Sequence, residues 1–383
     1  MPEKVRAAVM VAPGRLEVRE FSLPEPESGA VLLKIQLSGV CGTDKHTYRG
    51  ETKQYAGTPH ERDVPFPIIP GHENVGVVAA TGGEVRAFDG EPVRVGDRVV
   101  PAANITCGQC YYCKGDFPYY MCEHLEDYGN SLSIARPPHL FGGWAEYMYI
   151  LPGTHLYRVP DDLPSHIAVL TEVMAVTAGL DKAKEFSSPQ EGFRFGDTVV
   201  IQGVGPLGLC HLIKARLLGA GDIIAIDALP SRLAMARRFG ADHTIELQQT
   251  TEPERVEAVR GWTHGRGADV VVDCSGVAQA VPEGLDMTRA GGMFIEAGAF
   301  VDMGPVLINP NRHFCIKNIR LLGIGGEAAT AYGPTMTVLA KAQHHYPLGE
   351  IVTHRFGLEQ AEDAVMTSMA DEAMKVVISP GVG

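Results

Sequence analysis

Hydrophobic and polar positions follow two different patterns along the chain. Up to about residue 170 the apolar runs are short, are separated by glycine and proline, and show no long helical periodicity. Examples of such runs are residues 31–37, 75–80 and 93–100. Short apolar runs bounded by turn residues are typical of strands, so this part of the chain predicts an all-β unit.

From Asp197 onward, short apolar runs alternate with segments of helical spacing. Helical spacing occurs at 207–218 and 231–239, and strand-like runs occur at 198–202, 223–226, 244–247, 270–273, 293–297 and 319–324. Strands that are apolar on both faces and alternate with helices indicate a parallel sheet of the doubly wound type. The chain as a whole is therefore expected to belong to the α/β class.

The end of this alternation gives the expected domain organisation. A polar loop at 186–195 leads into the doubly wound unit. After Gly326 the chain no longer extends the alternation and is expected to return to the first domain, with a helix at 334–342 and closing patterns at 358–369 and 375–378. We therefore expect a first, β-rich domain of residues 1–171, completed by 326–383, and a doubly wound domain of residues 172–325.

Length and charge narrow the class of protein further. At roughly 150 residues per domain, 383 residues correspond to two or three domains. The net charge of −13 repels phosphate backbones and anionic lipids, so neither nucleic acid nor a membrane is expected as a partner. No apolar run reaches 18 residues, and the run at 7–13 is too short for a signal peptide. We expect a cytoplasmic protein.

A glycine-rich motif follows the first strand of the doubly wound unit. It reads Gly203-Val204-Gly205-Pro206-Leu207-Gly208, and Asp227 closes the next strand 19 residues later. In this context the helix N-terminus binds a pyrophosphate and the carboxylate binds a ribose hydroxyl. Ala228 follows Asp227, where an arginine could have held a 2′-phosphate, so the motif favours NAD over NADP. The alternative is a tight strand-to-helix turn without a ligand.

Four cysteines lie within sixteen positions, at Cys107, Cys110, Cys113 and Cys122. Four thiolates at this spacing suit a closed tetrahedral zinc site, which is structural because no coordination position is left for a substrate. The alternative is a set of free or disulfide-bonded thiols in a tyrosine-rich loop.

A second set of potential ligands is dispersed along the first domain. It consists of Cys41, His72, Glu73 and Glu172, which together offer one thiolate, one imidazole and one or two carboxylates. Three protein ligands and a free position would make an open, catalytic zinc site. Each of these residues alone is more often structural than ligating.

These motifs, in this order, resemble the zinc-dependent alcohol dehydrogenases of the medium-chain dehydrogenase/reductase superfamily. The resemblance covers nearly the whole chain and includes the segments at 41–46, 71–73, 96–99, 142–147, 273–276 and 373–378. It implies a GroES-like β-barrel catalytic domain, completed by the carboxyl-terminal segment, and a Rossmann domain. It also implies one catalytic and one structural zinc ion per chain, together with NAD.

The resemblance assigns the catalytic zinc ligands. Cys41, His72 and Glu172 match the three ligand positions, and Glu73 matches a carboxylate that either ligates the metal or stands behind it. Glu172 occupies a position where liver-type enzymes have cysteine, so this chain is closer to the polyol, butanediol and sorbitol dehydrogenases.

The resemblance also assigns supporting roles. Asp44 matches the acid that orients the ligating imidazole, and Thr43 and His46 match a proton relay. Arg232 matches the basic residue near the adenosine ribose. Extra residues around 54–63 depart from the family pattern, in a loop that borders the substrate cleft in the family. The substrates of known members therefore do not predict the substrate of this chain.

The expected function is reversible hydride transfer between a secondary alcohol or polyol and NAD, which gives the ketone in the oxidative direction. The alternatives are an aldose (glucose-type) 1-dehydrogenase of the same fold and a catalytically silent NAD-binding relative. A small alcohol or ketone is the expected partner. By analogy the protein is expected to form a homodimer or homotetramer through the strand at 319–324.

Overall fold

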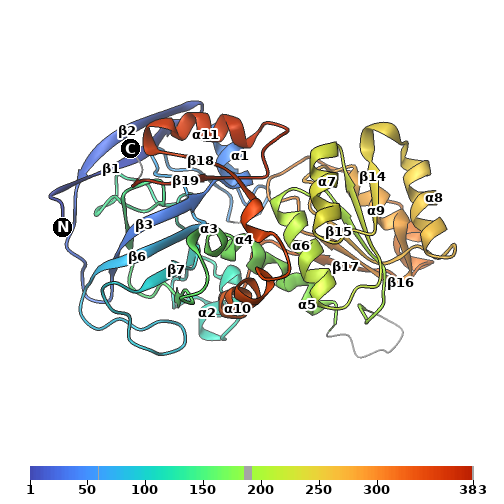
Figure 1. Cartoon of the computed structure of the whole chain (residues 1–383), viewed down its shortest axis with the longest axis horizontal. Coiled ribbons are helices and arrows are strands. Elements are labelled where there is room, and N and C mark those ends of the chain that lie inside the picture. The colour runs from blue at the N-terminus through green and yellow to red at the C-terminus, as the bar shows by residue number, and fades with distance from the viewer. Residues whose placement is uncertain (59, 185–191, 382–383) are drawn as a thin grey trace. The chain divides into compact units, whose positions relative to one another are not determined.

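A computed structural model describes residues 1–58, 60–184 and 192–381 (Figure 1). The chain forms two compact units, Met1–Ala175 with Ala328–Gly383, and Val176–Glu327. This division places Glu172 in the first unit, whereas the pattern of the sequence suggested that the second domain starts there. Much of the predicted polar loop at 186–195, and residue 59 of the 54–63 segment, lie outside the described residues.

The first unit is built on a seven-stranded sheet. Its strand order is β11-β7-β6-β3-β19-β18, and β10 also pairs with β3. The strands are β3 (Val31–Gly39), β6 (Asn74–Thr81), β7 (Arg98–Pro101), β10 (Tyr147–Ile150), β11 (Leu156–Arg158), β18 (Val352–Phe356) and β19 (Lys375–Ile378). The carboxyl-terminal β19 thus lies between β18 and β3, so the end of the chain completes the first unit.

The predicted strand at 93–100 is shorter in the structure. Only Arg98–Pro101 is a strand, because residues 94–97 form a turn in which the Asp97 carboxylate accepts the Arg94 amide at 2.8 Å. Gly96 in this turn has a φ of +98°, a conformation that side chains disfavour. The turn reverses the chain before β7 pairs with β6.

Smaller elements complete the first unit. The strands are β1 (Lys4–Ala12), β2 (Arg15–Ser22), β4 (Lys53–Gln54), β5 (Arg62–Asp63), β8 (Asn104–Ile105) and β9 (Glu126–Asp127). The helices are α1 (Gly42–Tyr48), α2 (Tyr111–Lys114), α3 (Ser165–Ala168), α4 (Thr171–Ala175), α10 (Tyr332–Ala342) and α11 (Ala361–Ser368). Trp144, Tyr128 and Phe141 are among the largest fully buried side chains of its core.

The second unit is a six-stranded sheet of order β14-β13-β12-β15-β16-β17, in which all neighbours are parallel. The strands are β12 (Val199–Gln202), β13 (Ile223–Asp227), β14 (His243–Glu246), β15 (Ala268–Asp273), β16 (Thr288–Glu296) and β17 (Arg320–Gly323). The strand order reverses between β12 and β15, which makes this the switch point where open α/β sheets bind ligands.

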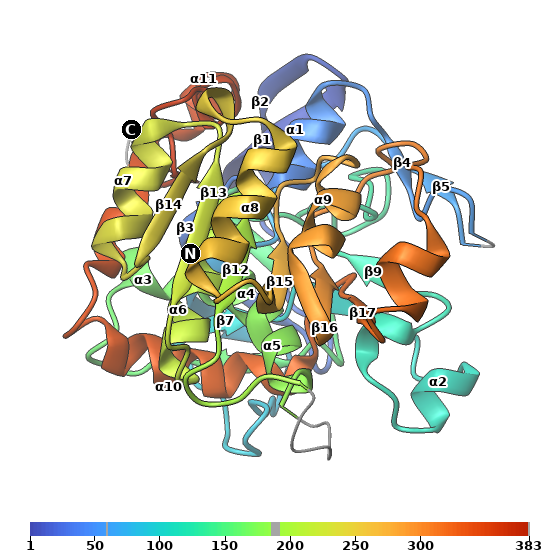
Figure 2. The ribbon, with the colours of Figure 1, turned by 90° about the vertical axis from the view of Figure 1, so that its right-hand side faces the viewer.

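Helices cover both faces of this sheet (Figures 1 and 2). They are α5 (Gly179–Lys182), α6 (Pro206–Leu217), α7 (Pro230–Arg238), α8 (Glu252–Trp262) and α9 (Ala280–Met287). The predicted helices correspond to α6 and α7, which contact β12, β13 and β14, whereas α9 contacts β15 and β16. No helix among the described residues of the chain is long and apolar enough to span a membrane.

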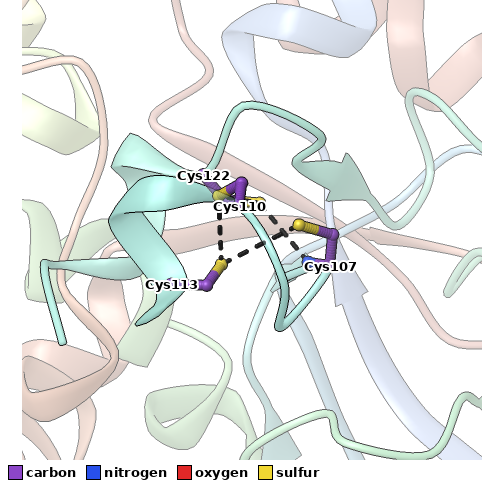
Figure 3. A group of neighbouring side chains, drawn as sticks. All are labelled: Cys107, Cys110, Cys113 and Cys122. Carbon is purple, nitrogen blue, oxygen red and sulfur yellow. Dashed lines mark hydrogen bonds between the residues drawn. The ribbon is translucent and has the colours of Figure 1, made fainter. Parts of the chain in front are cut away.

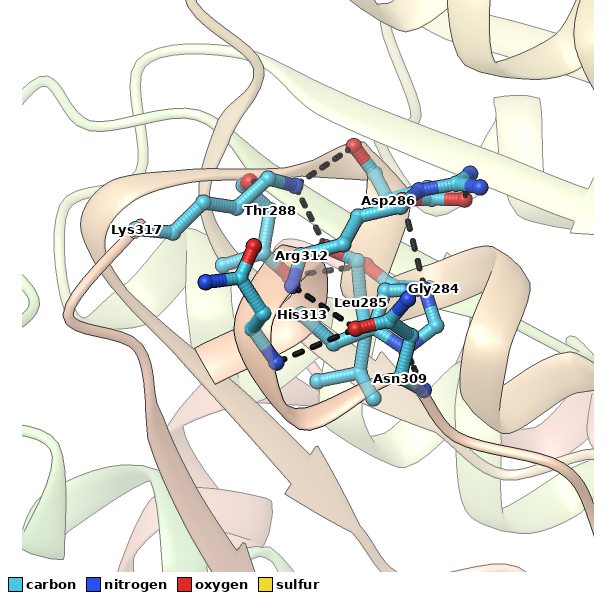
Figure 4. Close-up of polar contacts among 9 residues, drawn as sticks. Gly284, Leu285, Asp286, Thr288, Asn309, Arg312, His313 and Lys317 are labelled. Carbon is cyan, nitrogen blue, oxygen red and sulfur yellow. Dashed lines mark hydrogen bonds and ion pairs between the residues drawn. The ribbon is translucent and has the colours of Figure 1, made fainter. Parts of the chain in front are cut away.

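The carboxyl end of α9 is anchored by side chains that follow β16 (Figure 4). Lys317 donates to the backbone carbonyls of Leu285, Asp286 and Thr288 at 2.8, 3.1 and 3.0 Å. Arg312 forms an ion pair with the Asp286 carboxylate. Carbonyls at a helix C-terminus lack partners within the helix, so Lys317 satisfies them, while Arg312 neutralises the carboxylate of Asp286 in the last turn of α9.

Candidate zinc and dinucleotide sites

The four clustered cysteines converge in one lobe of the first unit (Figure 3). Cys110 lies 3.5 Å from Cys113 and 4.0 Å from Cys122, and Cys107 lies 4.0 Å from Cys113, measured between sulfur atoms. All four are free thiols. Cys110 precedes the short helix α2, and the turn brings Cys113 back towards it.

These distances fit a tetrahedral zinc ion. Four thiolates bound at about 2.3 Å in a tetrahedron have sulfur–sulfur separations of about 3.8 Å, close to those in the lobe. The backbone amides of Cys113 and Glu123 also lower the pKa of the Cys110 thiol to about 6, although burial opposes this. Cys107, Cys110, Cys113 and Cys122 would therefore hold a structural zinc ion.

Cys110→Ser is expected to remove zinc and stability together. A closed site contributes folding free energy because its ligands are brought together only in the folded chain. We expect one zinc ion per chain fewer by elemental analysis of undialysed protein, together with a lower thermal midpoint. Cys315→Ser, at an exposed position, serves as the control. Unchanged zinc content in Cys110→Ser would contradict the assignment.

The dispersed set also converges. Ligand atoms of Cys41, His72 and Glu73 all lie within 4.8 Å of one another. Cys41 is the N-cap of α1, and His72 and Glu73 immediately precede β6, which pairs with β3. Thiolate, imidazole and carboxylate in one buried group are the donor set of a catalytic zinc ion.

Glu73 has a second partner that the sequence did not indicate. Lys375 on β19 donates to the Glu73 carboxylate at 2.5 Å and to the Val40 carbonyl at 3.3 Å. Glu73 is 0% and Lys375 2% exposed. A side chain at Gly39 would collide with Glu73, since a Cβ there would lie 1.8 Å from its Oε2 atom. The structure thus places Glu73 between the potential metal ligands and a buried ammonium group.

Glu172 lies on α4 and is 9% exposed. It is not one of the group whose ligand atoms lie within 4.8 Å of one another, which in the described part of the chain contains Cys41, His72 and Glu73. It is nevertheless near, because its charge raises the pKa of both His72 and Lys375. In this structure, Glu73 is therefore closer to the Cys41–His72 pair than the predicted third ligand is.

The charged groups around Cys41 and His72 favour the binding of a cation. Burial opposes ionisation of Cys41, but His72 and Lys375 outweigh it, so the pKa of the thiol is lowered. Burial likewise opposes protonation of His72, but the charges of Cys41, Glu172 and Asp44 raise its pKa well above the usual value. Negative groups around a buried imidazole create a site that a divalent metal ion can occupy in place of the proton.

The predicted supporting residues lie on or beside α1. Asp44 is buried and accepts the Cys41 amide at 2.8 Å, so it fixes the N-cap that carries the thiolate. The hydroxyl oxygen of Thr43 is buried and has no hydrogen-bond partner among the described residues. His46 is paired through Nδ1 with Glu51, a residue that the sequence did not single out. Asn130, also missed, lies 3.4 Å from Nδ1 of His72.

The glycine-rich turn connects β12 to α6. Gly203 has a φ of +79°, and Gly208 lies where a Cβ would be 1.9 Å from the Gly203 carbonyl. Gly205 is the N-cap, with Pro206 and Leu207 beginning the helix. The turn therefore leaves amides at the N-terminus of α6 for an anion.

Asp227 ends β13 beside this turn. Its carboxylate accepts the Val204 amide at 2.8 Å and the Leu229 amide at 2.9 Å. A guanidinium nitrogen of Arg232 lies 3.9 Å from it. Both side chains thus occupy the edge where an adenosine ribose would bind.

A four-thiolate lobe, a Cys–His–carboxylate group and a glycine-rich turn on a doubly wound sheet define a zinc-dependent, dinucleotide-binding dehydrogenase. Family models support this class. The model described as alcohol dehydrogenase GroES-like domain matches residues 27–161, and that described as zinc-binding dehydrogenase matches residues 206–341.

Comparison with known sequences and crystal structures indicates the same class of dehydrogenase. The 5-exo-hydroxycamphor dehydrogenase of Pseudomonas putida is 35% identical over 376 residues, which cover 97% of this chain and 98% of the relative. The erythritol/L-threitol dehydrogenase of Mycolicibacterium smegmatis is 28% identical over 381 residues, 99% of each chain. The crystal structure of an alcohol dehydrogenase from Thermotoga maritima has a TM-score of 0.89 and 33% identity, and covers 98% of this chain and 99% of its own.

The chain therefore belongs to the zinc-dependent alcohol dehydrogenases of the medium-chain dehydrogenase/reductase superfamily. It is an oxidoreductase acting on CH–OH donors. The predicted α/β fold, with a GroES-like domain and a Rossmann sheet, is confirmed.

Proposed function

We propose that this protein oxidises a secondary alcohol or polyol to the ketone with NAD and catalyses the reverse reduction. The observation that carries the proposal is the convergence of Cys41, His72 and Glu73 in one buried group. Its relatives include an erythritol/L-threitol dehydrogenase and a sorbitol dehydrogenase, and these names do not favour the aldose alternative.

Cys41 and His72, with Glu73 or Glu172, would hold the catalytic zinc ion, which when bound supplies Lewis acidity towards the alcohol oxygen. The chain's own residues handle the proton that leaves the hydroxyl group. The hydroxyl of Thr43, which has no hydrogen-bond partner within the part of the chain that the structure describes, can accept a hydrogen bond from that group. His46 can release the proton to solvent because its side chain is 30% exposed. Glu51 orients the His46 ring through Nδ1.

The substrate class is tested by incubating the protein with NAD and a panel of simple alcohols, diols, polyols and sugars while NADH absorbance is recorded. We expect the highest kcat/KM for a secondary alcohol or a polyol. Oxidation of aldoses alone would favour the aldose 1-dehydrogenase. NADH binding without turnover of any panel member would favour the silent relative.

Asp227 supports NAD as the cofactor, because its carboxylate would repel a 2′-phosphate. Asp227→Ser combined with Ala228→Arg is expected to move the ratio of kcat/KM values towards NADP, since repulsion is replaced by a cation. Steady-state kinetics with both cofactors measure this ratio, and Asp242→Ser, further from the glycine-rich turn, is the control. Equal use of NAD and NADP by the unmodified enzyme would show that Asp227 does not select the cofactor.

We further propose a cytoplasmic homo-oligomer, a dimer or tetramer, whose partners are limited to its small alcohol or ketone substrate and its cofactors. The edge strand β17 supports pairing between copies, because Leu321 on it is 52% exposed. Unpaired strand edges favour association with a second strand. Light scattering coupled to size-exclusion chromatography tests this: a monomer would contradict it.

A further inference from the structure

Two carboxyl groups that the proposed reaction does not use lie side by side at the carboxyl edge of the second unit. Asp273 ends β15 and Glu296 ends β16, and the two are partners in the parallel register. Asp273 is 1% exposed, and Glu296 is partly buried. Neighbouring strands lie about 4.8 Å apart, so the two carboxyl groups are close together.

Each carboxyl group has one oxygen fixed by backbone amides. Oδ1 of Asp273 accepts the Ser275 amide at 2.8 Å. Oε1 of Glu296 accepts the amides of Gly298 and Ala299, both at 2.9 Å. Oε2 of Glu296 is buried and has no hydrogen-bond partner within the described residues. A buried carboxylate oxygen without a donor is costly unless it carries a proton.

The surroundings supply no cation to balance two negative charges. In the strand register the pair is flanked by Gln202 on β12 and Gly323 on β17, neither of which is charged. On the packed helix α9, Glu283 adds a further negative charge near Asp273 and is itself committed to Arg255. No ion pair to Asp273 or Glu296 is found in residues 1–58, 60–184 and 192–381.

The remaining titratable groups nearby are neutral. Burial and the charges of Asp273 and Glu296 raise the pKa of Cys274 well above its usual value. Its sulfur contacts His211 of α6 at 3.5 Å, and burial lowers the pKa of that imidazole to about 4. Neither group can compensate a doubly ionised pair at neutral pH.

The turns held by these carboxyl groups contact the glycine-rich turn. A Cβ at Gly203 would lie 2.7 Å from Cα of Ser275, and one at Gly298 would lie 2.6 Å from the Gly276 amide. The three turns after β12, β15 and β16 are therefore packed together at the edge where a dinucleotide binds. Because Asp227 places the adenosine half at β13, the nicotinamide half is left to β15 and β16.

We propose that Asp273 and Glu296 share one proton, and that loss of this proton biases the enzyme towards binding NAD⁺ over NADH. The inference rests on the proposed use of NAD. The proton leaves for solvent and adds one negative charge at this edge. NAD⁺ carries one positive charge more than NADH, on the nicotinamide ring, so the added charge favours the oxidised form.

The ionisation falls in the range of neutral pH. Burial and the neighbouring Asp273 carboxylate raise the pKa of Glu296 to about 7, and burial also raises the pKa of Asp273. A carboxyl group whose pKa is higher in the folded than in the unfolded chain binds more protons when folded. Its contribution to stability is present below the unfolded pKa of about 4.3 and is lost as the pH rises through about 7.

The test compares wild type with Glu296→Gln, which is neutral at every pH, and uses the exposed Glu257→Gln as a matched control. Calorimetry gives the dissociation constants of NAD⁺ and NADH from pH 6 to pH 8.5. A unit charge on the order of 10 Å from the nicotinamide ring, at a dielectric constant between those of protein and water, changes the ratio of the two dissociation constants about three- to tenfold. We expect the wild type and Glu257→Gln to gain this preference for NAD⁺ with rising pH, beyond any change seen in Glu296→Gln.

A second readout needs no cofactor. The thermal midpoint of Glu296→Gln, relative to that of wild type, should rise between pH 5.5 and pH 8.5, because the wild type loses the contribution of the bound proton over this range. Equal pH dependence of the binding ratio in wild type and Glu296→Gln would overturn the proposed bias. The same difference between the two midpoints at both pH values would overturn the shared proton. Failure of every variant to bind either nucleotide would instead refute the proposed function, whereas the midpoints would still test the proton.

Discussion

Cys41→Ser and His72→Ala are each expected to lower turnover by orders of magnitude while NADH affinity is retained. Serine replaces a soft thiolate by a poor neutral ligand, and alanine removes a ligand outright, so the Lewis acid that acts in the transition state is lost. The glycine-rich turn and Asp227 belong to the other compact unit and stay intact. Turnover, zinc content and NADH affinity should be measured together.

His46→Ala is the graded comparison for these variants. It removes only the outer end of a proton relay that water can partly replace, so a loss on the order of ten- to a hundredfold is expected, most visible below neutral pH. Glu172→Ala shows whether Glu73 can act in its place. Normal turnover in Cys41→Ser without the catalytic zinc would refute the mechanism, and a parallel loss of NADH affinity would indicate general unfolding.

Lys375→Met is expected to destabilise the first unit by about 3–5 kcal/mol, because it leaves the Glu73 carboxylate buried without its ammonium partner. Both side chains are almost fully buried and are 2.5 Å apart. Adding Glu73→Gln should restore most of the stability, since no unpaired charge is then left inside. Recovery in the double variant distinguishes an electrostatic effect from a packing defect.

Denaturant unfolding followed by tryptophan fluorescence measures this effect. Trp144 is buried in the first unit, so a Trp262→Phe background isolates its signal. Lys34→Met, at an exposed position of β3, is the matched control and should change stability by no more than about 0.5 kcal/mol. A loss in Lys375→Met no larger than in Lys34→Met would show that the buried pair does not stabilise the unit.

Patterns within short stretches of sequence predicted much of the fold. The alternation of apolar strands and helices after Asp197 predicted the parallel sheet, and the glycine-rich motif was correctly expected between a strand and a helix. The four clustered cysteines were recognisable because all ligands fall within sixteen residues, so one loop suffices to bring them together. Such features depend on the spacing of residues within a short stretch of chain, which can be read from the sequence.

Contacts between distant segments were decided only by the tertiary structure. Lys375 and Glu73 are 302 positions apart, and they meet because β19 inserts beside β3 in the sheet of the first unit. Glu73, rather than Glu172, lies closest to Cys41 and His72 for a similar reason, since the segment before β6 is held by β3. Asp273 and Glu296 become neighbours through the register of β15 and β16.

The sequence by itself therefore determined the class of protein and the position of the glycine-rich turn, and it indicated two sets of potential zinc ligands. The tertiary structure decided which buried charges face one another. Periodicity and motif spacing describe interactions over one or two turns of chain, whereas the ionisation of a buried group depends on every charge and donor that folding brings within a few ångströms of it.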